Sequence, residues 1–233
     1  MRSRSWAGFV VALTCQAAGC GDALGIEDFQ PPTIRGSLHD LTSDIVPGAM
    51  VALNRATGQR IATAITAKDG SFTFPITEGL PLDGYLEGLS GAYVPTINQL
   101  MVPVVDHVDN FQDVLTTTAA GLQLLADDAD TTLDATQWLV IAVVVDPGGS
   151  TVIGATVEAQ GGGGPKLCYT RQDNGRPCSL ASTLEDGRAW LFGVAQSDLL
   201  TITARDADGH RYQGSAQTFT GSGVVVAPVR QVQ

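Results

Sequence analysis

From residue 34 onward the chain alternates apolar and polar residues over short runs. The segments "GAMVALN", "RIATAIT" and "SFTFPI" are rich in β-branched and aromatic residues, and the turn sequences "ATGQ" and "AKDG" separate them. Alternation of this kind places every second side chain on one face of a strand. Short strands joined by glycine-containing turns predict a β-sandwich and not a fold in which strands alternate with helices.

The same pattern occurs twice along the chain. Asp40 precedes Gly48 by 8 residues, and a run of alternating apolar residues follows. Asp146 precedes Gly154 by the same 8 residues, again just before such a run. We therefore predict that the chain contains two related sandwiches in tandem.

In each copy an Asp-Gly pair marks a later tight turn before an outgoing strand, at residues 69–70 and 186–187. The interval from the entry glycine to this pair is 21 residues in the first copy and 32 in the second, so the second copy carries 11 additional residues. The insertion holds a glycine run at 161–164 together with Cys168 and Cys178. A hairpin loop tolerates such an insertion because it lies outside the core.

Between the two copies, apolar residues recur at steps of three and four positions, which predicts a helix. The residues at these steps are Val108, Phe111, Leu115, Thr118, Leu122 and Leu125. Asp106 or Asp109 is expected to cap the start of the helix. The alternative is an extra edge strand at "VLTTTA" followed by an irregular acidic loop.

These patterns predict an all-β fold in which a short helical connector joins two sandwiches. The expected order is a leader over 1–19, a tether over 20–33, the first sandwich over 34–105, the connector over 106–136, and the second sandwich over 137–233. The tether assignment rests on a short acidic stretch that ends in two prolines.

The N-terminal residues have the pattern of an export signal. Arg2 and Arg4 form a basic region, and "WAGFVVAL" is an apolar run too short to span a bilayer. The following "CQAAGC" resembles the lipobox of bacterial lipoproteins. The resemblance implies that Cys20 becomes the first mature residue and carries a diacylglyceryl thioether and an N-acyl chain such as palmitate. The alternative is cleavage by ordinary signal peptidase after Gly19, without lipid.

The charge balance excludes some partners. The chain has 13 basic and 24 acidic residues, a net charge of −11. Loss of Arg2 and Arg4 leaves 13 − 2 = 11 basic residues and a net charge near −13. Such a chain repels phosphate backbones and anionic headgroups, so we expect no nucleic acid as a partner and a membrane contact only through lipid.

Cysteine use is consistent with export. Once Cys15 has left with the leader and Cys20 has been acylated, Cys168 and Cys178 remain as an even pair, and we predict a disulfide between them. The loop that they close contains Tyr169, Arg171 and Arg176, a basic and aromatic island on an acidic protein. We therefore take these three residues as the candidate binding surface.

Motifs for catalysis or metal binding are not evident in the sequence. The three histidines, His39, His107 and His210, are not spaced with a second ligand as zinc sites require. The acidic run at 127–134 lacks the glycine and glutamate of an EF-hand, which favours a solvated linker over a calcium site. The chain also contains neither a nucleophile elbow nor a P-loop. We expect no cofactor, no metal and no catalytic residue.

The combination "GSLHD…VPGAMVAL…TGQRIATAITAKDGSFTFP" resembles the carboxypeptidase regulatory-like domain, a prealbumin-like (Ig-like) β-sandwich of about seven strands. The segment from 138 to the C-terminus repeats the pattern more weakly. Domains of this family accompany carboxypeptidases, outer-membrane transporters and surface adhesins as folding supports, spacers or binding modules. They are not catalytic themselves.

Together, the lipobox resemblance and the domain resemblance imply a lipid-anchored protein of the cell envelope, at the outer membrane or the periplasmic face. We expect it to act as a structural or binding module toward an envelope glycan or protein. The alternative is a glycan-processing hydrolase, or an accessory domain, that uses carboxylates at the interface between the sandwiches. Those carboxylates would lie ~5–10 Å apart in one cleft.

Overall fold

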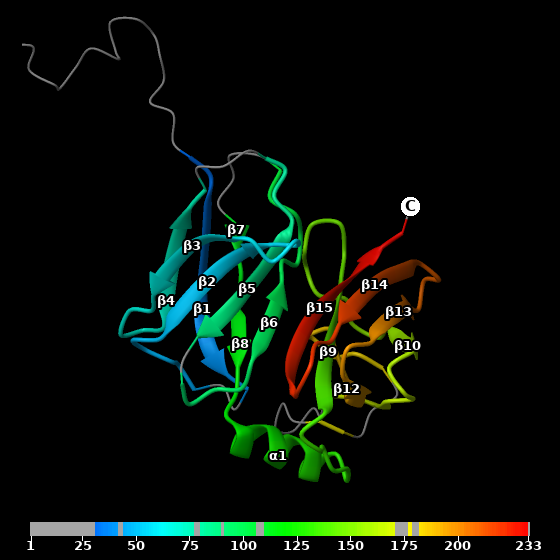
Figure 1. Cartoon of the computed structure of the whole chain (residues 1–233). Coiled ribbons are helices and arrows are strands. Elements are labelled where there is room, and N and C mark those ends of the chain that lie inside the picture. Colours follow the sequence, from blue (N-terminus) through cyan, green and yellow to red (C-terminus); the bar gives the residue numbers. More distant parts are fainter. Residues whose placement is uncertain are drawn as a thin grey trace, which may run out of the picture. The chain divides into compact units, whose positions relative to one another are not determined.

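The computed structural model describes residues 31–41, 44–76, 80–89, 91–105, 110–170, 177–178 and 182–232. Strands dominate, and one helix occurs within these ranges, so the all-β prediction is confirmed (Figure 1). Residues Pro32–Gln233 form one compact unit. No helix in this part of the chain is both long and apolar enough to cross a membrane.

The first sandwich packs a sheet around β1 against a sheet around β2. Its strands are β1 (Thr33–Asp40), β2 (Met50–Arg55), β3 (Arg60–Ile65), β4 (Ser71–Pro75), β5 (Gly84–Leu89), β6 (Thr96–Gln99), β7 (Asn110–Phe111) and β8 (Val114–Thr116). β1 pairs antiparallel with β4 and parallel with β7 and β8, and the facing sheet has the order β3-β2-β5-β6. Phe72 and Phe74 point inward from β4 and join Leu53 and Leu86 in the core, as their alternation predicts.

The second sandwich repeats these pairings. Its strands are β9 (Gln137–Val145), β10 (Thr156–Gln160), β11 (Lys166–Tyr169), β12 (Arg188–Ala195), β13 (Leu199–Arg205), β14 (Arg211–Gln217) and β15 (Gly223–Gln231). β9 pairs antiparallel with β12 and parallel with β15, as β1 does with β4 and with β7 and β8. β13 lies between β10 and β14, as β5 lies between β2 and β6. β11 departs from the repeat, because it pairs with β12 whereas β3 pairs with β2.

A buried threonine shows how closely the two copies correspond. Thr66 Oγ1 accepts a hydrogen bond from the backbone N–H of Ala49 at 3.0 Å and donates to the carbonyl of Val46 at 2.7 Å. Thr183 makes the same two bonds to the turn around Gly154, at 3.0 and 2.7 Å. The side chains are 4% and 1% exposed. Each threonine therefore ties the strand-entry turn of its sandwich to the segment that leads into the Asp-Gly turn.

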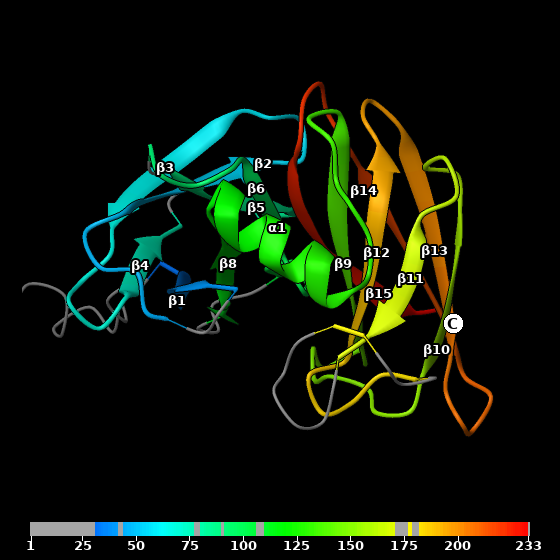
Figure 2. The same ribbon diagram turned by 90° about the horizontal axis from the view of Figure 1, so that it is seen from below.

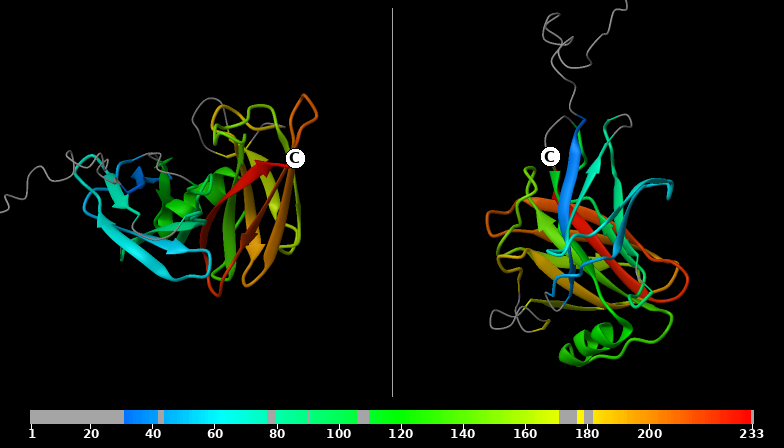
Figure 3. Two further views of the ribbon diagram at one scale, coloured as in Figure 1. Left: turned by 90° about the horizontal axis from the view of Figure 1, so that it is seen from above. Right: turned by 90° about the vertical axis from the view of Figure 1, so that its left-hand side faces the viewer.

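The C-terminal strand β15 joins the two sandwiches into one sheet. Its first half pairs parallel with β6 of the first sandwich, at 224–226, and its end pairs with β14, at 230–231. Pro228 lies where β15 passes from one neighbour to the other, and this is the position where a missing backbone N–H is tolerated. Figure 3 shows β15, in red, at the junction of the two sets of strands.

The helix α1 (Ala119–Asp128) and β8 cover the outer faces of β9 and β15. Leu122 and Leu125 of α1 share a core with Ile141 of β9 and Val226 of β15. β9 is consequently buried on both faces, which explains why "WLVIAVVV" is a continuous apolar run and not an alternating one. Figure 2 shows α1 lying across the ends of both sets of strands.

The helix is shorter than predicted and begins later. Phe111 and Leu115, which the periodicity assigned to the helix, lie in β7 and β8. The N-cap is Thr118, whose hydroxyl accepts from the backbone N–H of Gly121 at 3.0 Å. The proposed caps Asp106 and Asp109 fall outside the described residues. The threonines at 116–118 explain the difference, because β-branched residues favour extended backbone and a threonine favours the N-cap.

The two interpretations of the connector are therefore combined in the structure. The segment "VLTTTA" supplies a strand, as the alternative stated, and the residues after it supply the helix. At its other end, the helix is held by Lys166 of β11, whose Nζ donates to the carbonyls of Ala129 and Asp130, the latter at 2.8 Å. A cation placed at the last carbonyls stabilises a helix C-terminus.

Candidate functional site

The predicted disulfide is present, and Tyr169, one of the three residues of the predicted binding surface, is buried. Cys168 and Cys178 are bonded, with their Cα atoms 5.0 Å apart. Tyr169 is only 6% exposed, and its hydroxyl accepts from the backbone N–H of Val157 at 2.9 Å. It is a core residue because β11 turns this side chain inward, so its place in a recognition surface was wrong. Arg171 and Arg176, and the lipidation candidate Cys20, lie outside the described residues.

The acidic run at 127–134 does not gather its carboxylates. Asp127 accepts from Gln123 within α1, at 2.9 Å. Asp134 accepts from the backbone N–H and hydroxyl of Thr136, at 2.7 and 2.6 Å, and these bonds lower its pKa. These two carboxylates therefore close local contacts within the helix and the following turn. Among the described residues, three metal-ligating side chains come together elsewhere, in the hairpin that follows β13.

That hairpin is locked by Asp206. Its Oδ2 accepts from the Tyr212 hydroxyl at 2.8 Å and lies 2.9 Å from His210 Nδ1, while Oδ1 accepts from the His210 backbone N–H. Partial burial opposes ionisation, but these bonds outweigh it and lower the pKa of Asp206 to about 2. Burial and the same bond raise the pKa of Tyr212 to about 12. Since the oxygens of Asp206 are already engaged, its grouping with Asp208 and His210 is explained by the turn.

A serine, a histidine and an aspartate meet beside β1, but in an order unlike that of a catalytic triad. Ser37 Oγ donates to Asp113 Oδ1 at 2.8 Å, and His39 Nε2 lies 2.7 Å from the same oxygen of Ser37. The serine proton goes to the carboxylate, so the histidine is the donor in this contact. In a triad the histidine lies between the serine and the acid and takes the serine proton. The sequence separation of 76 residues between Ser37 and Asp113 hid this contact from sequence reasoning.

A cavity of about 420 Å³ between the sandwiches bears on the hydrolase alternative, because Asp113 and Asp186 both line it. Asp186 accepts from the Thr170 hydroxyl at 2.7 Å and from the backbone N–H of Arg188 at 3.1 Å. It is the aspartate of the second Asp-Gly turn, and Asp69 makes the corresponding backbone contact in the first sandwich. Both cavity carboxylates thus accept hydrogen bonds from within the protein.

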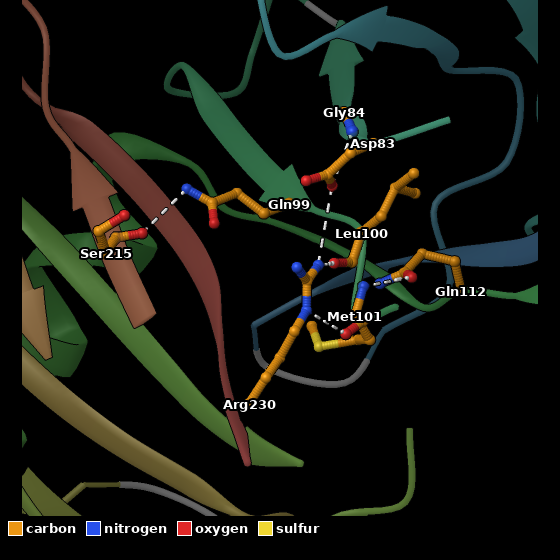
Figure 4. A network of polar contacts seen from close by, with 8 residues as sticks. All are labelled: Asp83, Gly84, Gln99, Leu100, Met101, Gln112, Ser215 and Arg230. Carbon is orange, nitrogen blue, oxygen red and sulfur yellow. Dashed lines mark hydrogen bonds and ion pairs between the residues drawn. The ribbon is translucent and has the colours of Figure 1, made fainter. Parts of the chain in front are cut away.

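Arg230 fastens the end of β15 to the first sandwich (Figure 4). Its Nε donates to the carbonyl of Met101 at 3.0 Å, and its Nη2 donates to the carbonyl of Leu100 at 2.6 Å. The same Nη2 lies 3.7 Å from a carboxylate oxygen of Asp83. Two charge-assisted bonds to backbone and one ion pair therefore hold the first sandwich against the last strand of the second.

A groove of about 430 Å³ lies over the junction where β15 joins the two sandwiches. We call this junction the seam, and the groove the seam groove. Its walls come from outward-facing positions of β5 and β6 on one side and of β13 and β14 on the other. Uncharged polar side chains supply much of its surface: Gln99, Thr201, Gln213, Ser215 and Gln217. Tyr85 and Phe219 add one aromatic ring from each sandwich, and the charged residues Asp83 and Arg230 are paired with each other.

Several hydrogen-bonding groups of this seam groove are free to meet a ligand. The Gln213 amide and the hydroxyls of Thr201 and Ser215 have no partner within the described part of the chain. Gln99 uses its Nε2 to reach the carbonyl of Ser215 across the seam at 3.3 Å, which leaves its oxygen available (Figure 4). Gln217 likewise donates to backbone carbonyls. The groove therefore presents both acceptors and donors without a net charge.

Comparison with known proteins adds no family. No family model matches the chain, and no curated protein matches its sequence. The carboxypeptidase regulatory-like family and the lipobox therefore stay predictions.

Some solved structures are similar to the chain at low sequence identity. They include the Bacillus anthracis TIE protein (12% identity, TM-score 0.31, 86% of this chain and 34% of that one) and a streptococcal ancillary pilin (14%, 0.30, 88% and 64%). A third is BcpA, the major pilin subunit of Bacillus cereus (10%, 0.31, 86% and 69%). The chain thus spans about a third of the first protein and less than two thirds of the second. TM-scores this low assign no function to the chain.

Proposed function

We propose that the chain is an exported protein of the cell envelope, anchored by lipid on Cys20, whose seam groove binds a glycan without catalysis. The observation that carries the proposal is the lining of the groove. It combines uncharged amides and hydroxyls with one aromatic ring on each side.

The lining fits a glycan because of the chemistry of sugar rings. A sugar presents hydroxyl groups that both donate and accept, and Gln, Ser and Thr side chains do the same. The apolar face of the ring packs on an aromatic side chain, a role that Tyr85 and Phe219 are placed to fill. A volume of about 430 Å³ also lies within the range of small-molecule sites, which extends from roughly 300 to 1,000 Å³.

The seam also holds the groove rigid. Its two walls belong to different sandwiches, yet β15 pairs with strands of both, and Arg230 bonds the backbone next to β6. Walls fixed before the ligand arrives lower the entropy cost of binding. A protein partner would need deeply buried aromatic or arginine anchors at the centre of its interface. The polar lining therefore favours a glycan over a protein.

Titration of the purified mature chain with tetra-N-acetylchitotetraose, a neutral oligosaccharide, tests the groove. We expect amide NMR signals of β6, β13 and β14 to shift in a saturable manner. The Gln213→Ala/Ser215→Ala double variant should weaken binding at least about tenfold, because it removes two of the three free groups that β13 and β14 supply. Gln160→Ala, on the exposed edge strand β10 outside the groove, is the matched control. Equal loss in both variants, or shifts confined to other strands, would contradict the site.

The lipid anchor requires a separate test. In cells fed labelled palmitate, the mature protein should carry label, and Cys20→Ser should carry none. An unlabelled mature protein that begins at Cys20 would instead support ordinary signal-peptidase cleavage, and would leave the groove proposal untouched.

A further inference from the structure

Two arginines face each other at one end of the outer surface of β13 and β14. Arg205 is the last residue of β13 and pairs directly with Arg211, the first residue of β14, and both side chains are exposed. Directly opposed like charges destabilise a strand pair. The arrangement is unexpected in a chain with a net charge of −11, in which carboxylates outnumber basic groups.

Neither arginine side chain has a partner among the described residues. Arg60, Arg188 and Arg230 each form an ion pair, whereas no ion pair or side-chain hydrogen bond is formed by Arg205 or Arg211 within the described ranges. The adjacent hairpin does not neutralise them at contact distance, because the Asp206 carboxylate is engaged by Tyr212 and His210.

Arg205 and Arg211 both line a hollow of about 500 Å³. Thr156, Thr203 and Gln213 line it with further hydrogen-bonding groups, and Glu158 is the one carboxylate in its lining. A guanidinium offers a planar pair of donors that matches a carboxylate or sulfate, so an anion between two arginines turns their repulsion into shared attraction. The hollow thus has the donors of an anion site and room for the rest of a ligand.

This hollow continues the seam groove. Gln213 lines both, and Arg211, Gln213 and Ser215 project from the same face of β14 at steps of about 7 Å. An extended ligand that lies along β14 in the groove therefore reaches the arginines with its end.

We infer that Arg205 and Arg211 form an anion-binding site for a carboxylate or sulfate group of the groove ligand, which makes that ligand an acidic glycan. The inference rests on the proposed function for the glycan, but the anion site itself does not depend on it.

Inorganic sulfate probes the anion site alone. Titrated into the mature chain at constant ionic strength against chloride, sulfate should shift the side-chain Nε–Hε NMR signals of Arg205 and Arg211 in a saturable manner. Arg205→Gln and Arg211→Gln should each abolish the response of the remaining arginine. Arg60→Gln is the matched control, since Arg60 is half exposed and already paired with Glu87. Absent shifts, or equal shifts at Arg60, would overturn the inference.

A matched pair of oligosaccharides tests the ligand class. A hyaluronan tetrasaccharide carries carboxylates, and its carboxyl-reduced form is the same chain without them. We expect the acidic form to bind at least about tenfold more tightly, and the Arg205→Gln/Arg211→Gln variant to remove the difference. Equal affinity for both forms would overturn the inference and leave the groove function standing. A sulfate response without binding of either oligosaccharide would keep the anion site and reject the glycan. The arginine variants should not unfold at a lower urea concentration than the native chain, because each substitution relieves the repulsion between the two arginines.

Discussion

At the scale of single residues, the molecule depends on polar side chains that satisfy buried backbone groups. The hydroxyls of Thr66 and Thr183 each hydrogen-bond the backbone of a strand-entry turn. The Asn98 side chain makes two hydrogen bonds, both of 2.9 Å, to the backbone of Leu115 in the facing sheet. Such contacts tie together segments that belong to different strands. A residue type alone does not reveal them, because most Thr and Asn residues lie on surfaces.

Replacing either bridging threonine by valine should destabilise the protein. Thr66→Val and Thr183→Val each leave a buried backbone N–H and a carbonyl without a partner, and we expect each to lower the free energy of unfolding by about 2–3 kcal/mol. Urea denaturation measures the loss. Thr→Ser at the same sites keeps the hydroxyl and should lose much less. Valine variants as stable as the native chain would show that these bonds are dispensable.

The Asp206 hairpin should give a stability change at acid pH. The folded-state pKa of Asp206 is about 2 against an ordinary value of 3.8. Because the pKa is lowered on folding, the stabilising contribution is present above pH ~3.8 and is lost as the pH falls toward ~2. The difference in Tm between native chain and Asp206→Asn should therefore shrink over this interval. A difference that stays constant from pH 6 to pH 2 would contradict the assignment.

At the scale of elements, the second sandwich differs from the first chiefly by its inserted loop, which the disulfide closes. The loop joins β11 to the segment before β12, and β11 also carries the buried Tyr169 and the helix-capping Lys166. The insertion is therefore anchored to both the core and the helix, although it was expected to be a surface feature.

Reduction of the disulfide should destabilise the chain without unfolding it. The bond spans 10 residues, for which the chain-entropy model gives about 2–3 kcal/mol. We expect the free energy of unfolding measured by urea denaturation to fall by this amount on adding reductant. The Cys168→Ala/Cys178→Ala variant is the control and should not respond to reductant. If reductant does not change the free energy of unfolding of the native chain, other contacts hold the loop.

Strands were predictable where one face meets the core and the other meets water. The alternation of Phe72 and Phe74, and the repeated Asp-Gly turns, report such strands directly. The start of the helix was not predictable from periodicity, because Phe111 and Leu115 match helical spacing while packing in short strands. Tyr169 was misplaced for a related reason: neighbours in a strand point to opposite faces, so Tyr169 lies in the sandwich core while the adjacent Cys168 packs in the other core.

At the scale of the whole molecule, the two copies of the repeat are not independent. β15 serves the second sandwich and also extends the sheet of the first, while α1 and β8 share a core with β9. The seam groove exists only because of this union. Its residues come mostly from β5, β6, β13 and β14, with others from β15 and the connecting loops, so no local spacing indicates them. The alternation within β13 and β14 does show which of their side chains face outward.

The unit formed by Pro32–Gln233 should unfold in one cooperative step. We expect differential scanning calorimetry to show a single transition whose calorimetric and van't Hoff enthalpies agree. Arg230→Met removes the bonds to Leu100 and Met101 and should weaken this coupling, seen as faster hydrogen exchange in β6. Arg188→Met, which breaks an ion pair within the second sandwich, is the control. Two separate transitions in the native chain would contradict a shared unit.

The pairing of β15 also fixes an order of assembly for the shared sheet. Until residues 223–231 have docked, β6 and β9 each keep one bare hydrogen-bonding edge. The first sandwich gains its neighbour across the junction only from β15, and the second sandwich cannot close before β15 is in place. A variant truncated before residue 223 would therefore expose two strand edges that can pair with other chains, so aggregation and not a smaller native fold is its expected fate.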